Sequence, residues 1–283
     1  LGLLGLADAL EGSNDQMIQR HHQPRARRII QLFMNGGPFQ GDLWDPKPDL
    51  QRFAGQRPSE VNLRTERATA GLLPSPVTWK RAGQSGIPMS SLLPKFASCM
   101  DDVCVIRSLY SNNPNHGPAL LMMNNGTITP SVPSMGAWLS YGLGTENENL
   151  PAYVVLCPGR PVRFSVLWNS AFLPSEHQGV YVNHSDLDVK KLIPFLRHPN
   201  MDLSSQRRQL ELMSNFNRTH LESRQRDPVL EARIRSMETA FRMQTEAANA
   251  FNLGLEPENV RKMYGSSHFA NGCLLARRMV ERG

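Results

Sequence analysis

The chain has 283 residues, of which 40% are hydrophobic and 20% are charged. This balance is typical of a globular protein with a sizeable core, and it excludes disordered and fibrous classes. Basic residues outnumber acidic ones by 31 to 25, giving a formal net charge of +6. Much of the excess lies in residues 20–28, a run without interleaved aromatic residues. We therefore expect a solvated lead-in and no nucleic-acid partner. No apolar stretch is long enough to predict a membrane span.

The first ten residues, LGLLGLADAL, form a short apolar run that ends in Ala7-Asp8-Ala9. This pattern is typical of the end of an export signal, and it fits an ordinary amphipathic first helix equally well. Residues 11–28 are polar and basic. We predict that residues 1–28 are a signal remnant and lead-in, and that a single domain starts at residue 29.

Three apolar runs predict strands, at residues 29–34, 103–106 and 152–157. The first is almost continuously apolar, which is typical of a strand buried on both faces. Helices are predicted between these strands, at residues 118–124 and 134–143. This alternation predicts an α/β fold with a largely parallel sheet. Residues 48–90 are rich in Pro, Gly, Arg and Thr and predict a long irregular excursion.

Residues 204–265 are charged and helical in pattern, which predicts a helical insertion. A last helix is expected over residues 271–282, and the chain stops where an α/β protein would continue with a strand. We therefore expect the sequence to be a fragment. The cysteines are Cys99, Cys104, Cys157 and Cys273, without a CxxC pair. Buried free thiols are expected at Cys104 and Cys157, and cysteine usage does not decide the cellular compartment.

The clearest candidate site follows the first predicted strand, where the chain turns at Asn35-Gly36-Gly37-Pro38 and then carries Asp42 and Asp45. A carboxylate at a strand end is a common ligand of a divalent metal in hydrolytic sites. The other interpretation is that aspartates in a Gly- and Pro-rich loop hydrogen-bond their own backbone. Spacing alone leaves both possibilities open.

His116 is the second candidate, because the loop 111–117 leads into a predicted helix whose N-terminus could bind an anion. Arg107, at the end of the second predicted strand, could lie nearby and contact the same anion. The alternative for His116 is a loop histidine bonded to backbone. The sequence contains neither a GxSxG nucleophile motif nor a P-loop.

Several short motifs together resemble one family. They are GGP at residues 36–38, Asp42, WDPKP at 44–48, VIRS at 105–108, NHGPAL at 115–120, PSMGAW at 133–138, YGLGTE at 141–146, LPA at 150–152 and LLARR at 274–278. Their order and spacing are similar to those of the exported bacterial proteins grouped as domain-of-unknown-function family 1501. The set is specific as a group, although no single motif is.

This resemblance implies a distant relationship to the alkaline phosphatase and sulfatase superfamily. It therefore implies an alkaline-phosphatase-like α/β sandwich with a metal site at strand ends. It also implies a twin-arginine export signal and a periplasmic or extracellular location in bacteria. Family members continue with further Asp- and His-containing motifs, which supports the expectation of a fragment. Where the family often has Ser and Thr, this chain has Phe39 and Leu43.

Two functions follow as expectations. The first is a metal-dependent hydrolase of phosphate or sulfate esters, with Asp42 and Asp45 on a divalent metal and with His116 and Arg107 on the metal or the ester. No hydroxyl or thiol occurs at Asn115-His116, where related enzymes place the nucleophile, so direct attack by water is the favoured version. The second is a non-catalytic exported protein that binds sulfated or phosphorylated glycans.

Overall fold

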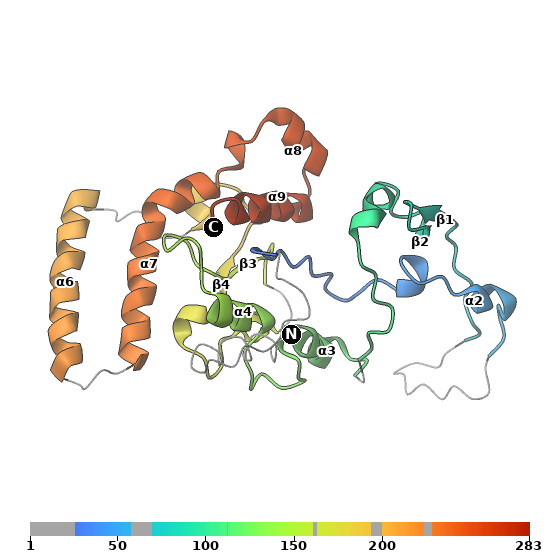
Figure 1. Ribbon diagram of the computed structural model, residues 1–283, viewed down its shortest axis with the longest axis horizontal. Coiled ribbons are helices and arrows are strands. Elements are labelled where there is room, and N and C mark those ends of the chain that lie inside the picture. Colours follow the sequence, from blue (N-terminus) through green and yellow to red (C-terminus); the bar gives the residue numbers. More distant parts are fainter. Residues whose placement is uncertain (1–25, 58–69, 112, 161–162, 194–199, 224–227) are drawn as a thin grey trace. The chain divides into compact units, whose positions relative to one another are not determined.

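A tight hairpin, β1 (Trp79–Ala82) paired antiparallel with β2 (Ile87–Ser90), lies in the first of two compact units of the computed structural model (Figure 1). This unit spans Phe33–Asn112, and the second unit comprises Asn113–Gly283 together with the segment ending at Leu32. The structure describes residues 26–57, 70–111, 113–160, 163–193, 200–223 and 228–283.

The hairpin turn is held by a carboxylate from outside the hairpin. Asp101 accepts hydrogen bonds of 2.9 Å from the backbone N–H groups of Gln84 and Ser85. These two bonds stabilise the charged form and lower the pKa of Asp101. Met89 of β2 and Met100 of η3 are almost completely buried and belong to one small apolar cluster. The prediction of an irregular excursion over residues 48–90 is therefore wrong for the hairpin, whose short strands gave too weak a pattern to recognise.

The remaining elements of this unit are short helical turns. They are η2 (Gln40–Asp42), α2 (Pro48–Arg52) and η3 (Phe96–Asp102). Pro48 is the first residue of α2, where its missing N–H costs nothing. Trp44 and Phe96 meet edge to face with ring centroids 4.9 Å apart, which joins the loop after η2 to η3.

The second unit contains a parallel strand pair, β3 (Val154–Leu156) and β4 (Val180–Val182), with Val154 opposite Val180. The strand predicted at residues 152–157 is thus confirmed. Parallel strands need a crossover connection, and this one contains the 3-10 turns η4 (Phe164–Trp168) and η5 (Ser175–His177).

Helices make up most of the second unit. They are α3 (His116–Asn125), α4 (Met135–Leu143), α5 (Val189–Leu192), α6 (Leu203–Ser223), α7 (Pro228–Ala250), α8 (Glu258–Tyr264) and α9 (His268–Val280), with the 3-10 turn η6 (Leu253–Leu255) before α8. The predicted helices at residues 118–124, 134–143 and 271–282 are confirmed as α3, α4 and α9. The predicted helical insertion at residues 204–265 corresponds to α6, α7 and α8.

Local sequence signals mark one end of α3 and one end of α4. Gly126 ends α3 in the left-handed conformation, with φ of 76°. Ser134 begins α4, and its side chain accepts a hydrogen bond from the Ala137 N–H. Both signals depend on residues next to one another in sequence, which is why the sequence was sufficient to find them.

The core of the second unit lies where α7, α9 and the parallel strands meet. Phe251, Leu274 and Leu275 are each at most 1% exposed there. Helix α7 lies between α6 and the rest of this unit, with α9 beyond its C-terminal end (Figure 1). The apolar face of α9 is therefore fixed against the end of α7.

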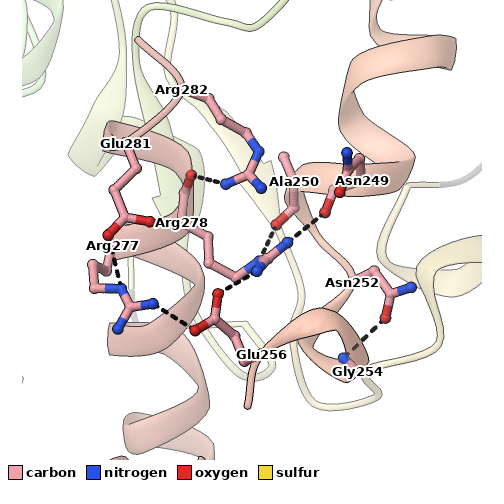
Figure 2. A network of polar contacts seen from close by, with 9 residues as sticks. All are labelled: Asn249, Ala250, Asn252, Gly254, Glu256, Arg277, Arg278, Glu281 and Arg282. Atoms are coloured by element: carbon pink, nitrogen blue, oxygen red, sulfur yellow. Dashed lines mark hydrogen bonds and ion pairs between the residues drawn. The ribbon is translucent and has the colours of Figure 1, made fainter. Parts of the chain in front are cut away.

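A buried ion pair supports this junction (Figure 2). Arg278, only 3% exposed, pairs with Glu256 and also donates to the carbonyl oxygens of Asn249 and Ala250, at 2.8 and 3.0 Å. These carbonyls end α7 and have no partner within the helix. Arg277 binds the other oxygen of Glu256 at 2.5 Å. One α9 arginine thus caps α7 while Glu256 neutralises the buried charge.

Two of the predicted strands are wrong. Residues 29–34 and 103–106 form no strand, and Ile29, Leu32 and Ile106 are 51%, 59% and 60% exposed. A strand exists only through ladder hydrogen bonds to a neighbour, and these runs make none within the described residues. Cys104, expected to be a buried thiol in the second strand, is exposed for the same reason. Cys157 is half-buried, and burial raises the pKa of its thiol.

The chain is therefore a mixed helix-and-sheet protein, compatible with the α/β class. Each described sheet has two strands, and one of the two sheets is parallel. Among the helices in the described ranges, none is both long enough and apolar enough to cross a lipid bilayer.

Candidate functional site

The loop that carries Asp42 and Asp45 is wound around one backbone oxygen. The N–H groups of Leu43, Trp44 and Asp45 all point to the carbonyl of Gln40, at 3.1, 2.9 and 3.1 Å. This winding extends the short η2 turn and keeps both carboxylates within one turn of chain. The sequence already grouped the two aspartates, because they are only three residues apart.

Each aspartate already has a partner. The Ser75 hydroxyl donates to Asp42 at 2.6 Å, and the half-buried carboxylate of Asp42 keeps its second oxygen outside that bond. Asp45 forms an ion pair with Lys47. The interpretation as turn chemistry and the interpretation as ligands both remain compatible with these contacts, since a surface hydrogen bond or ion pair is worth only about 1 kcal/mol and can be exchanged.

Arg107 contacts the same loop from a distant part of the sequence. Its Nε donates to the carbonyl oxygen of Trp44 at 3.0 Å, so the guanidinium lies beside the residue between the two aspartates. The sequence placed Arg107 near the start of the helix that follows it. Arg107 and His116 fall in different compact units.

His116 is the first residue of α3 and is exposed. The N-cap residue, Asn115, has an extended backbone and makes no side-chain capping bond. The next residue, Gly117, lies against a guanidinium: a Cβ built on it would be 2.9 Å from both Nε and Nη2 of Arg163. The first turn of α3 thus combines an imidazole, an arginine and helix N–H groups without a side-chain cap.

Arg163 itself adopts an unusual backbone conformation. Its φ is 68°, in the left-handed region that costs a residue with a side chain about 1 kcal/mol or more. It lies just before η4, which packs on α3. Sequence reasoning missed Arg163, because no local pattern places residue 163 beside residue 117.

The sequence also did not predict a second polar cluster. The hydroxyl of Ser140 lies 2.9 Å from Nδ1 of His177, whose Nε2 lies 3.6 Å from Glu176, and Glu176 pairs with Arg235. Burial lowers the pKa of His177; Glu176 opposes this and Arg235 adds to it. Ser140 is 5% exposed and lies inside α4. This chain of contacts joins α4, η5 and α7.

His184 is the most deeply buried histidine among the described residues, at 2% exposure. Its Nε2 lies 3.0 Å from the carbonyl oxygen of His268, at the start of α9. Asp186, two residues later, is exposed and pairs with Lys191 at 2.6 Å. The two residues therefore do not form a common site.

The donor chemistry at Asp42 and Asp45 fits a hard divalent cation. In the part of the chain that the structure describes, no group of three His, Cys, Asp or Glu side chains is arranged to hold a metal ion. The aspartates and Arg107 are close in one unit, and His116 with Arg163 forms a separate arrangement in the other.

These features define a mixed helix-and-sheet protein that has a carboxylate loop in one unit and a basic helix start in the other. The chain belongs to the family described as protein of unknown function DUF1501, which matches residues 26–283. This match confirms the family expected from the short motifs. No curated protein and no solved structure matches the chain significantly.

Proposed function

We propose that this chain binds a phosphate or sulfate ester at the first turn of α3. The observation that carries this function is the guanidinium of Arg163 against Gly117, next to His116, at a helix start without a side-chain cap. The resemblance to ester hydrolases of the alkaline phosphatase and sulfatase superfamily supports the same ligand class. A sulfated or phosphorylated glycan is the natural form of such a ligand for an exported protein.

The physical reason is the sum of three donors. The first N–H groups of a helix point outward and carry the positive end of its dipole, which favours an anion. A planar guanidinium adds two parallel N–H donors that match the oxygens of a phosphate or sulfate. His116 offers one further donor from the same turn. The unfavourable backbone of Arg163 is consistent with a residue held in place for binding.

A second candidate is metal-dependent hydrolysis of the same esters, favoured by the two carboxylates on one tight loop and by Arg107, which donates to the backbone of that loop. Asp42 and Asp45 would hold the cation, with Asp42 giving up its bond to Ser75 and Asp45 its pair with Lys47. A bound divalent metal would polarise the ester and activate a water. Arg107 would neutralise a non-bridging ester oxygen.

Titration calorimetry with inorganic sulfate and phosphate tests the binding function. We expect Arg163→Ala and His116→Ala each to weaken binding, Arg163→Ala by at least about tenfold because a charge-assisted pair of bonds is lost. The matched control is Arg261→Ala, an exposed arginine of α8, which should leave binding unchanged. No heat with either anion, or equal losses in the control, would overturn the function.

Chromogenic phosphate and sulfate esters separate the two candidates. Turnover that needs a divalent metal and disappears in Asp42→Ala would establish the hydrolase. Anion binding without turnover would establish the binding protein. Metal binding that is absent, or unchanged in Asp42→Ala, would reject Asp42 as a ligand. Export to the periplasm or the cell exterior rests on residues 1–10, which lie outside the described residues, and stays a prediction.

A further inference from the structure

Asn125 is the last residue of α3, and it is only 8% exposed. Its side-chain Nδ2 lies within hydrogen-bond distance of three acceptors. These are the carbonyl oxygens of Val132 and Val166, at 3.1 and 3.2 Å, and Oδ1 of Asn169, at 3.3 Å. The nitrogen has two hydrogens to share among them, whereas the reversed amide would turn its oxygen toward all three. The contacts therefore fix the orientation of this side chain.

These bonds tie the end of α3 to η4. Val166 lies within η4 and Asn169 directly follows it, and η4 packs on α3. The side chain of Asn169 also donates to the carbonyl oxygen of Pro130 at 3.3 Å, and its own carbonyl accepts from the N–H of Ser134 at 3.0 Å. The middle and the end of η4 are thus anchored by buried polar contacts.

The start of η4 reaches the other end of α3. Arg163 directly precedes η4, and its guanidinium lies against the first turn of α3 at Gly117. Three residues of a 3-10 helix cover only about 6 Å, so the anchor at Val166 is a short distance from Arg163 along the chain. A shift of η4 along α3 would therefore carry Arg163 with it.

Gly117 provides the space that this guanidinium occupies. A Cβ at this position would lie 2.9 Å from Nε and from Nη2 of Arg163, which is closer than van der Waals contact. The guanidinium is the far end of a flexible side chain, so it would move away while the helix stays in place. Gly117 also precedes Pro118, where a Cβ disfavours the helical backbone. The two reasons for a glycine are separable by experiment.

We propose that Asn125 and Gly117 are positioning residues of the anion site. Asn125 fixes η4 on α3, and Gly117 leaves room for the Arg163 guanidinium beside His116. This inference rests on the proposed function at the first turn of α3. Asn125 lies at the opposite end of α3 and Gly117 has no side chain, so each acts through Arg163. A guanidinium that binds two oxygens at once requires a defined position, because both N–H donors must match them.

Gly117→Ala tests the space for the guanidinium, with titration calorimetry of inorganic sulfate and phosphate as the measurement. We expect this variant to bind the anions at least about fivefold more weakly than the wild type, because the paired donors are displaced. In an Arg163→Ala background the same substitution should cost no further affinity, since there is no guanidinium left to displace. A role in the backbone before Pro118 would weaken binding in both backgrounds.

Asn125→Ala tests the anchor in the same way. We expect at least about threefold weaker anion binding in samples that circular dichroism shows to be folded, and again no further loss in the Arg163→Ala background. Asn169→Ala removes one acceptor of the anchor and provides a second test if Asn125→Ala does not fold. The matched control is Asn124→Ala, the neighbouring asparagine of α3, whose Nδ2 donates to the Leu120 carbonyl of its own helix at 2.9 Å. This control should leave binding unchanged.

The outcomes separate the two ideas. No heat from the wild type with either anion would overturn the proposed function and the positioning roles together. Binding that Arg163→Ala weakens, but that stays unchanged in Gly117→Ala or in both anchor variants, would overturn the positioning alone. Equal losses with and without Arg163 would also overturn it, because they indicate a purely structural role.

Discussion

His184 shows how one close approach fixes residues that are far apart in sequence. A Cβ built on Gly272 would lie 2.8 Å from Nε2 of His184, so only glycine allows α9 to pass this imidazole. Burial lowers the pKa of His184, with partial opposition from bonds to the His268 and Val182 backbone. Its neutral form is therefore the one that the folded chain accommodates.

A pH dependence follows with a definite sign. Because the pKa of His184 is lower in the folded chain than its ordinary value of about 6.5, the unfolded chain binds more protons as the pH falls below 6.5. This contribution to stability is complete above that pH and decreases below it. Urea unfolding at pH 7.5 and at pH 5.0 measures how much free energy of unfolding is lost as the pH falls. We expect this loss to be smaller for His184→Gln than for the wild type.

His177 offers the comparison within the same chain, since burial also lowers its pKa. His177→Gln should reduce the pH dependence as well, and the double variant should reduce it further. An identical pH slope in the wild type and in both variants would contradict the assignment.

At the candidate loop, the sequence predicted the residue types and the turn, and the structure supplied their partners. Asp42 and Asp45 are grouped by local chain geometry, which sequence spacing reports. Ser75 and Arg107 reach this loop from 33 and 63 residues away, a proximity that no local pattern reports. The sequence did not predict that Arg163 lies beside Gly117, because these residues are also far apart along the chain.

At the scale of elements, helices were easier to predict than strands. Helices α3, α4 and α9 are closed by hydrogen bonds within the helix and marked by Ser or Gly at their ends, so a short window of sequence contains the necessary information. Residues 29–34 have an apolar pattern typical of a strand but lack ladder partners in the described chain. Apolar pattern alone does not create a strand.

The caps of α4 and α9 allow a matched comparison. Each serine side chain accepts a hydrogen bond from the backbone N–H three residues later, at 3.4 Å for Ser134 and 3.1 Å for Ser267. Ser134 is only 1% exposed, whereas Ser267 is exposed. Replacement of either by Ala should cost about 0.5–2 kcal/mol. We expect the larger loss for Ser134→Ala, because no water can replace the bond to the buried N–H. Chemical denaturation of both variants measures the order, and a larger loss for Ser267→Ala would contradict it.

At the scale of the whole second unit, the Glu256 cluster joins the end of α7 to α9 (Figure 2). Burial opposes the charge on Glu256, but hydrogen bonds from Arg278 and Arg277 outweigh it and lower the pKa of this carboxyl. Removal of Glu256 would leave Arg278 charged and buried. We therefore expect Glu256→Ala to lower the free energy of unfolding by about 3–5 kcal/mol.

A neighbouring glutamate provides the control for this prediction. Glu258 pairs with Lys262 on the exposed side of α8, with a side chain that is 72% exposed. Glu258→Ala should change stability by less than about 1 kcal/mol, as expected for a surface pair. Equal losses for the two variants, measured by urea unfolding at pH 7, would show that burial does not set the cost.

By itself, the sequence determined the family, the presence of helices α3, α4 and α9 and the carboxylate turn, because each depends on residues that are close along the chain. Only the tertiary structure decided which apolar runs become strands, which cation caps α7, and which arginine lies at the start of α3. Those outcomes depend on contacts between residues tens of positions apart. Such contacts form only when burial and long-range hydrogen bonds together offset the entropy of ordering the chain.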